Sequence, residues 1–160
     1  MRTLLVEGLE PRAVGHYDAA PLIRETLLVY SFGAEIRTEV ARSLPVRGDP
    51  STLRHTLVNL LVNCAAHAPG SDLTVTGSRE DGAVTVRVAD SGPRTRASGP
   101  RSGRRGIGLA LSRRLLAEEG GSVELVANAA GRGHVAEVRL VAAGRPGEVG
   151  PPESGRDRDR

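Results

Sequence analysis

Two of the three asparagines in this 160-residue chain, Asn59 and Asn63, lie four positions apart in a segment with helical periodicity. Residues four apart share one face of a helix, so both amides point to the same side, at the edge of an apolar stripe. An amide oxygen is a suitable ligand for a hard cation such as Mg²⁺, which prefers oxygen and retains water when it also binds phosphate. Two interpretations stay open, a magnesium site or a pair of amides that cap neighbouring loops.

A carboxylate follows a run of alternating valines. The run 84–88 predicts a strand, and the tripeptide Asp90-Ser91-Gly92 comes directly after it. A carboxylate at the end of a strand, followed by glycine, can accept a hydrogen bond from an exocyclic amine in a pocket. The same three residues also suit an ordinary turn.

Glycines precede a third predicted helix. Gly106 and Gly108 open a segment whose apolar residues have helical spacing, and Arg104 and Arg105 come immediately before them. Glycines at the start of a helix let backbone N–H groups approach a phosphate, and the helix dipole favours an anion there. The alternative is a flexible loop that leads into the helix.

The elements that would position these residues follow from hydrophobic periodicity and capping signals. The 49–66 helix is the clearest, with Asp49 as N-cap and Pro50 in the first turn. Asp81-Gly82 predicts a hairpin turn between two strands. Helices are expected at 21–32, 49–66 and 106–119, and strands at 35–41, 73–78, 83–89, 122–127 and 135–141. This order predicts an α+β fold of two layers, with helices on one face of a sheet.

The length and composition fit one globular domain. We expect an N-terminal extension at 1–18, a domain at 19–143 and a disordered tail at 144–160, where the sequence consists mostly of Gly, Pro, Arg, Asp and Glu. The expected core consists of Leu22, Leu27, Leu53, Leu57, Leu60, Leu61, Val75, Val86, Val88, Ile107, Leu111, Leu115, Val123, Leu125, Val138 and Leu140.

Several classes of protein are excluded by composition. A single cysteine, Cys64, excludes an internal disulfide framework and a cysteine-based zinc site. The chain has no apolar run long enough to span a membrane and no signal peptide, so we expect a soluble, cytoplasmic protein. All 22 basic residues are arginine, the net charge is only +3 and aromatics make up 2%, so we expect neither a nucleic-acid nor a membrane partner.

Taken in order, these motifs resemble the histidine-kinase-type ATPase family, which includes DNA gyrase and Hsp90. Residues 49–69 are similar to the family's asparagine box, and residues 90–92 to its first glycine box. Residues 106–111 are similar to its second glycine box, and residues 131–134 to its Gly-x-Gly-Thr hairpin. The resemblance covers about residues 19–141. It implies a Bergerat-type ATP-binding fold, with a mixed, mostly antiparallel sheet, in a bacterial two-component signalling protein.

The resemblance also implies roles for particular residues. Asn63 would ligate a Mg²⁺ that bridges the ATP phosphates, and Asp90 would accept the adenine amino group. Asn59 stands where hydrolysing relatives have a catalytic Glu. An amide cannot take a proton, so hydrolysis would be slow and ATP would be held for transfer to another group. The other implied nucleotide contacts are His67, Gly92, Gly106, Gly108 and Leu109.

The sequence departs from the family pattern at two positions. Ala66 stands three residues after Asn63, where kinases of the family usually have a basic residue, and Arg94 replaces a glycine. The family's phenylalanine box is missing. Residues 91–105 contain five arginines and no acid, so Arg104, Arg105 and their neighbours could replace the missing charge through bidentate bonds to phosphate. A solvated basic loop is the alternative.

The residues of this sequence include no phosphoacceptor histidine in the family's sequence context. We therefore expect that the domain holds Mg-ATP for phosphoryl transfer to a His or Ser on another chain. The alternative is a non-catalytic, pseudokinase-like interaction module, in which nucleotide is a structural or gating ligand. The sequence alone leaves open whether the protein is an enzyme.

Overall fold

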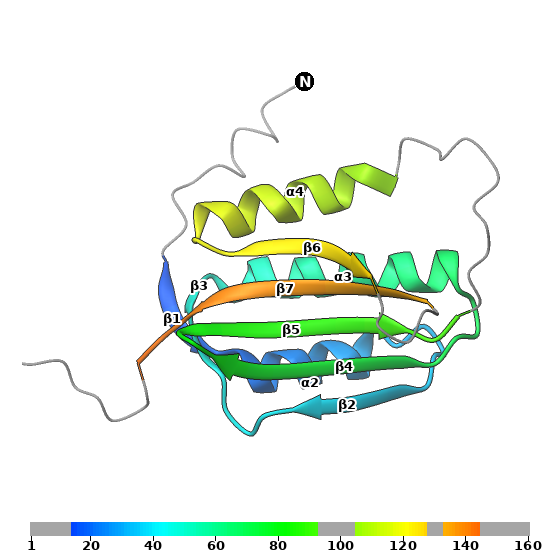
Figure 1. The fold of residues 1–160 in the computed structure, drawn as a ribbon, viewed down its shortest axis with the longest axis horizontal. Helices are drawn as coiled ribbons and strands as arrows, with labels where there is room; N and C mark the ends of the chain where they lie inside the picture. The colour runs from blue at the N-terminus through cyan, green and yellow to red at the C-terminus, as the bar shows by residue number, and fades with distance from the viewer. Residues whose placement is uncertain (1–13, 93–104, 128–132, 145–160) are drawn as a thin grey trace, which may run out of the picture.

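The computed structural model describes residues 14–92, 105–127 and 133–144 of the chain. The elements are β1 (Gly15–Asp18), α2 (Ala19–Val29), β2 (Ile36–Val40), β3 (Pro45–Gly48), α3 (Pro50–His67), β4 (Leu73–Glu80), β5 (Ala83–Asp90), α4 (Arg105–Glu118), β6 (Ser122–Ala127) and β7 (His134–Ala142) (Figure 1). Among these residues no helix is both apolar and long enough to cross a bilayer.

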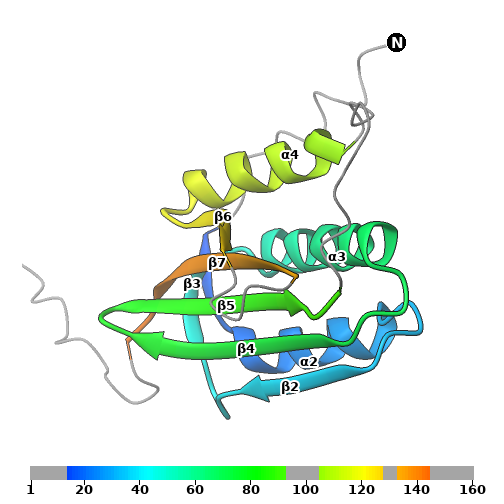
Figure 2. The same cartoon turned by 45° about the vertical axis from the view of Figure 1, so that its right-hand side comes forward.

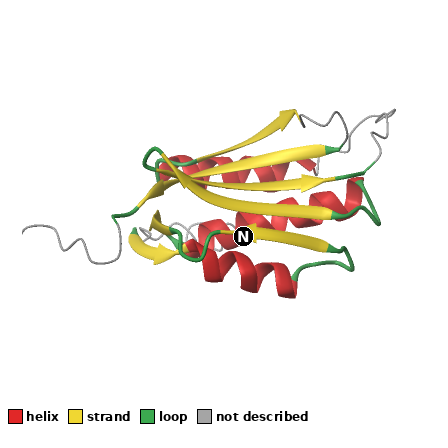
Figure 3. Cartoon of the chain, turned by 60° about the horizontal axis from the view of Figure 1, so that its bottom comes forward, coloured by secondary structure: helices red, strands yellow, loops and turns green. Residues whose placement is uncertain are grey.

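The strands form one 7-stranded sheet in the order β1-β3-β7-β5-β4-β2, with β6 paired to β7 outside this path. Of the described pairs, β2–β4 is parallel and the others are antiparallel. Figure 2 and Figure 3 show the helices on one side of the sheet. The predicted two-layer α+β architecture with a mixed, mostly antiparallel sheet is therefore confirmed.

Helix α3 begins and ends where its sequence predicts. The Asp49 side chain accepts a hydrogen bond from the Ser51 backbone N–H at 2.8 Å, and Pro50 occupies the first turn, where its missing N–H costs nothing. At the other end, the Ala68 N–H donates to the Cys64 carbonyl. The buried face consists of Thr52, Leu53, Thr56, Leu57, Leu60 and Leu61.

The hairpin of β4 and β5 turns at Asp81 and Gly82, as predicted. Both residues have positive φ, 47° and 76°, which is the backbone that a two-residue hairpin turn requires. The register that follows pairs Leu73 with Asp90 at the open end of the hairpin. The turn therefore places the Asp90 carboxylate at the end of β5 beside the start of β4.

The sheet begins earlier than predicted and contains two strands that were not predicted, β1 and β3. β1 lies within the stretch assigned to the N-terminal extension, and it pairs with β3, for which no strand was predicted. Both strands have only four residues, too few for alternation to stand out from loop sequence. The Val46 side chain of β3 is fully buried.

The core contains twelve of the sixteen predicted positions, which are Leu22, Leu27, Leu53, Leu57, Leu60, Leu61, Val75, Val86, Val88, Val123, Val138 and Leu140. The prediction is wrong for Leu111 and Leu125, which are 44% and 61% exposed. Among the described side chains of α4, those of residues 108–118, the buried ones are Leu109, Ser112 and Leu116. Ser112 is buried on this face because its hydroxyl contacts the Asn59 side chain of α3. A prediction from apolar spacing alone therefore selected the wrong face of α4.

Two predicted core positions of α4 remain, Leu115 and Ile107. Leu115 is half-buried, and the Ile107 side chain lies outside the described part of the chain. The basic stretch 93–104 and the tail from 145 onward also lie outside it.

Asp18 joins the start of α2 to the segment before β3. Its Oδ1 accepts hydrogen bonds from the backbone N–H groups of Ala20 at 3.0 Å and Leu44 at 2.8 Å, and its Oδ2 accepts one from the Ser43 hydroxyl at 2.8 Å. Burial by itself raises the pKa of Asp18, but these hydrogen bonds and the nearby Arg24 lower it below its usual value. Asp18 is therefore a helix cap whose charge stabilises the fold.

We predict that Asp18→Ala lowers the free energy of unfolding by about 1–2 kcal/mol at pH 7, the usual cost of losing a helix cap. A carboxylate with a depressed folded pKa stabilises the protein above its unfolded pKa, and this contribution is lost as pH falls through the folded pKa. The difference from wild type should therefore shrink below about pH 4. Urea unfolding at a series of pH values measures it.

The matched control is Asp72→Ala, which removes an exposed carboxylate. An equal loss of stability in both variants, or a difference from wild type that does not change with pH, would contradict the role given to Asp18.

Candidate functional site

Asp90 is a buried carboxylate at the end of β5. Its side chain is 4% exposed, and Oδ1 accepts a hydrogen bond from the Gly92 N–H at 3.2 Å. Its Oδ2 lies 3.6 Å from Nδ1 of His134. The β5–β7 ladder ends with Ala89 opposite Val135, so the next residues in this register are Asp90 and His134. Backbone pairing thus holds the histidine beside the carboxylate.

Two glycines allow the chain to pack closely around Asp90. A Cβ on Gly92 would lie 2.6 Å from Oγ of Ser71 and 2.8 Å from Cβ of Ala68. Gly133 has φ +71°, and a Cβ there would collide with the backbone carbonyl of Asp90. Larger residues are excluded at both positions. Gly92, after β5, and Gly133, before β7, therefore both lie close to the carboxylate, and the side chains of Ser71 and Ala68 pack against Gly92.

Cys64 brings the last turns of α3 close to the same carboxylate. Burial, and then the negative charge of Asp90, raise the pKa of the Cys64 thiol to about 11. The thiol is therefore neutral at physiological pH, and it acts as an apolar neighbour of Asp90 rather than as a nucleophile.

Asn59 faces α4, at the opposite end of the same stretch of α3. Its Nδ2 lies 3.2 Å from the Gly108 carbonyl oxygen and 3.3 Å from the Ser112 hydroxyl, as a donor to both. It also lies 3.1 Å from Nε2 of His55. A Cβ on Gly108 would stand 3.1 Å from Oδ1 of Asn59, so the glycine permits the close approach of the two helices.

The two helices are also joined near the other end of α4. Glu119 follows α4, and its Oε1 accepts hydrogen bonds from the Asp49 N–H at 3.2 Å and from the Thr52 hydroxyl at 2.7 Å. Both donors belong to the N-terminus of α3, where a negative charge is favourable. The contacts of Asn59 and Glu119 together fix α4 against α3.

Asn63 lies one turn after Asn59 on α3 and is half-buried. Along α3, Asn63 thus lies between Asn59, which contacts α4, and Cys64, which lies near Asp90. The structure therefore brings Asn59 together with Gly108, and Asp90 together with Gly92, with Asn63 on the helix that joins the two groups.

The remaining predicted residues are more dispersed. His67 is exposed at the end of α3, and Leu109 is 7% exposed and packs in the core. Gly106 is in the first turn of α4, at the place where this helix was predicted to begin. Arg104 lies outside the described residues, and α4 begins at Arg105, whose side chain also lies outside them.

Three neighbours of these residues were not predicted from the sequence. Ser112 and His55 contact Asn59, and Cys64 lies near Asp90. For Ser112 a signal was present, since a lone serine at helical spacing between Leu109 and Leu116 suggests a buried hydroxyl with a partner.

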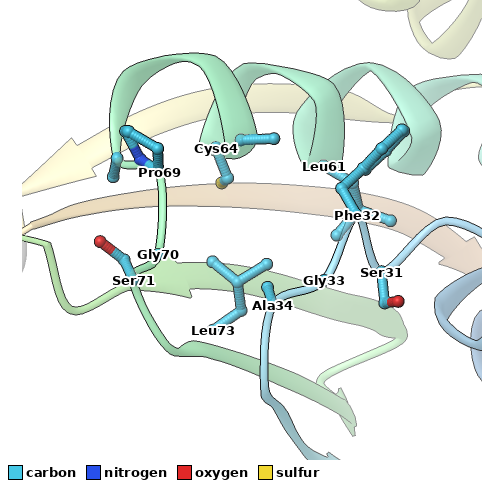
Figure 4. Close-up of a pocket in the computed structure, with 12 residues that line it drawn as sticks. Ser31, Phe32, Gly33, Ala34, Leu61, Cys64, Pro69, Gly70, Ser71 and Leu73 are labelled. Carbon is cyan, nitrogen blue, oxygen red and sulfur yellow. The ribbon is translucent and has the colours of Figure 1, made fainter.

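A small cavity lies beside the C-terminal half of α3 (Figure 4). Its volume is about 110 Å³, and its walls come from residues 31–34, from α3 and from residues 69–73. Sites for drug-sized ligands usually enclose about 300–1,000 Å³, so this cavity is too small for a nucleotide. Asp90 does not line it.

The sequence is similar to those of two mycobacterial proteins. Two proteins of Mycobacterium tuberculosis are each 35% identical to the chain over an alignment of 116 positions, and each match covers 63% of the chain. One is the "Sensor histidine kinase component HK1", of which the match covers 68%. The other is a "Probable sensor histidine kinase HK", of which it covers 30%, so the chain spans less than a third of that protein.

Solved structures of histidine kinases share the fold. The catalytic domain of histidine kinase ThkA superposes with a TM-score of 0.68 at 20% identity, over 81% of this chain and 97% of that one. The mycobacterial sensor histidine kinase MprB has a TM-score of 0.64 at 23% identity, over 81% and 98%. Full-length ShkA, in complex with AMPPNP, has a TM-score of 0.66 at 25% identity, over 84% and 32%.

The family itself is identified from the sequence of the region that contains the site. Residues 48–143 match the family "Histidine kinase-, DNA gyrase B-, and HSP90-like ATPase", and this region extends from the start of α3 to the end of β7. It includes Asn59, Asn63, Asp90, Gly108 and Gly133. The chain therefore belongs to the histidine kinase-, DNA gyrase B- and HSP90-like ATPase family.

Proposed function

We propose that this chain is an ATP-binding domain of a bacterial histidine-kinase-like signalling protein, and that it holds Mg-ATP for phosphoryl transfer to a partner chain. The observation that carries the proposal is the buried Asp90 carboxylate enclosed by Gly92 and Gly133. Burial of a charged group is costly unless the charge is paired or hydrogen-bonded, so a buried carboxylate at this place suggests a binding role. Glycine has no side chain, so Gly92 and Gly133 bring only backbone atoms close to the carboxylate.

Asp90 is the proposed recognition group for adenine. A carboxylate has about four acceptor positions, and the described contacts use one of them, the hydrogen bond from Gly92. The exocyclic amine of adenine would donate to another. Guanine has a carbonyl at that place, which would face the carboxylate without a hydrogen bond, so the site favours ATP over GTP.

The start of α4 is the proposed phosphate site. Gly106 and Gly108 lie in its first turns, where backbone N–H groups have no partner within the helix and the dipole favours an anion. We propose that Arg104 and Arg105, at the same end, add positive charge toward the phosphates.

Asn63 is the proposed magnesium ligand. The described residues contain no group of three His, Cys, Asp or Glu side chains that could hold a metal by themselves. One amide oxygen with phosphate and water fits the way in which Mg²⁺ binds with nucleotides, and the metal would neutralise charge on the phosphates. The half-burial of Asn63, between Asn59 and Cys64 on α3, supports this role.

Asn59 supports transfer rather than rapid hydrolysis. Its amide N–H groups are directed at the Gly108 carbonyl and the Ser112 hydroxyl, and an amide cannot accept a proton from water. We therefore propose that Asn59 positions the N-terminus of α4. The names of the two mycobacterial relatives, and the AMPPNP in the ShkA structure, agree with a nucleotide-dependent kinase.

A non-catalytic module is the second candidate, and two observations favour it. Ala66 is exposed on α3 and supplies no charge where kinases of the family usually have a basic residue. His134 lies beside Asp90 at 3.6 Å, on the side where a small hydroxyl is usual. In this case nucleotide would be a structural or gating ligand.

Titration calorimetry with a non-hydrolysable ATP analogue, with and without Mg²⁺, tests the site. We expect Asp90→Asn to weaken binding by about 10–100-fold, since a hydrogen bond to a charged group contributes about 1.5–3 kcal/mol. Asn63→Ala should reduce the affinity chiefly in the presence of Mg²⁺. Asp72→Asn, an exposed carboxylate, is the matched control. Unchanged affinity in Asp90→Asn, or no binding at millimolar nucleotide, would refute the proposal.

A second prediction concerns the position of α4. Asn59→Asp replaces the donor near the Gly108 carbonyl by a carboxylate oxygen, so we expect a loss of about 1–3 kcal/mol in the free energy of unfolding without nucleotide. Asn63→Asp is the same change one helical turn later and should cost less. Urea unfolding measures both variants. Equal losses would show that Asn59 does not anchor α4.

A further inference from the structure

The outer edge of β2 is open. β2 is the last strand in the sheet order, and no described strand pairs with its far side (Figure 1). The Glu35 carbonyl accepts from the Leu73 N–H, and the Ala41 N–H donates to the Gly77 carbonyl, so the odd-numbered residues direct their backbone groups to β4. The backbone groups of Ile36, Thr38 and Val40 therefore point away from the sheet.

A groove with apolar and polar walls runs along this edge on the helix side. Residues of α2, of the α2–β2 connection and of β2 line a groove of about 610 Å³. Its apolar walls are Leu27, Leu28, Ala34, Ile36 and Val40, and its polar walls are Arg24, Ser31 and Thr38. Leu28 is 83% exposed in this groove. Apolar side chains such as Leu28 beside a strand edge that no described strand covers mark a surface for a protein partner.

We infer that this partner is a second copy of the chain, whose β2 pairs antiparallel with the first about a two-fold axis at Thr38. In this register Arg37 of each copy lies opposite Glu39 of the other, and Ile36 lies opposite Val40. The strand is thus self-complementary in charge and in apolar character, as an interface with two-fold symmetry requires.

The hydrogen-bonding pattern selects the same register. In an antiparallel pair about Thr38, the hydrogen-bonded positions are Thr38 with Thr38, and Ile36 with Val40, which are the residues whose backbone groups point outward. The Val40 carbonyl accepts from Arg24 Nη2 at 3.1 Å, and a carbonyl oxygen can accept a second hydrogen bond. A parallel pair in register would instead place Arg37 against Arg37 and Glu39 against Glu39.

The paired strands would bring the two grooves together. The two-fold axis is perpendicular to the sheet, so both α2 helices lie on the same face of the joined sheets. The exposed Leu28 of each copy would then be covered by the α2 wall of the other. This inference does not depend on nucleotide binding.

Sedimentation of the full chain, from about 1 µM to 500 µM, tests the inference over the range expected for a small interface. We expect a reversible equilibrium between the 16.8 kDa chain and its dimer. Arg37→Glu and Glu39→Arg should each raise the dissociation constant about tenfold or more, since each sets like charges opposite each other twice per dimer. The double variant Arg37→Glu/Glu39→Arg restores both pairs and should return it to near wild type.

Two further variants separate the edge from general effects. Thr38→Pro removes an outward N–H and leaves the β4 side of the strand intact, so it should abolish the dimer. Arg47→Glu makes the same change of charge on β3, and it should have no effect. Circular dichroism checks that each variant is folded; if Thr38→Pro fails to fold, the charge variants decide.

Three results would overturn the inference. The first is a monomer at the highest concentration. The second is a dimer that Arg37→Glu and Glu39→Arg do not weaken. The third is a loss of dimer in both single variants that the double variant does not restore, since only antiparallel self-pairing predicts that rescue. A monomeric chain whose edge variants lose binding to a different protein would assign the edge to that protein instead.

Discussion

The site depends on the antiparallel pairing of β5 with a neighbour on each side. On one side, β4 places Leu73 opposite Asp90. On the other side, β7 pairs Val135 with Ala89, so the preceding residue, His134, lies beside Asp90. A buried carboxylate must be enclosed without losing its hydrogen bonds, and here backbone provides both the enclosure and the donor, through Gly133 and Gly92. The tightest packing in this region thus surrounds the one charged group at the end of the strand.

Much of this arrangement follows from short-range signals in the sequence. Asp49 and Pro50 define the start of α3, and Asp81-Gly82 defines the turn that brings Asp90, at the end of β5, beside the start of β4. Such signals act within a few residues, so a single sequence reveals them. The contacts that complete the site join distant segments instead. No local pattern showed that Asn59 would meet Gly108 and Ser112, or that β3 would exist.

The errors on α4 have the same physical origin. Helical periodicity ranks faces by their apolar content, and it selected the face with Leu111. The structure buries the face with Gly108 and Ser112 because close approach to α3, and a hydrogen bond to the Asn59 amide, outweigh the burial of one more leucine. A glycine and a serine on one helical face can therefore mark an interhelical contact that hydrophobicity does not reveal.

The topology also separates the candidate site from the open edge. β2 ends the sheet on one side, whereas α4 packs beside β6, and β6 is joined to β2 only through β7, β5 and β4. A copy paired at β2 would extend the sheet away from α4 and leave the helix start with Gly106 uncovered. Because the odd residues of β2 bond to β4, such pairing would also leave the ladder that positions Asp90 unchanged. Self-association and nucleotide binding are therefore compatible in one molecule.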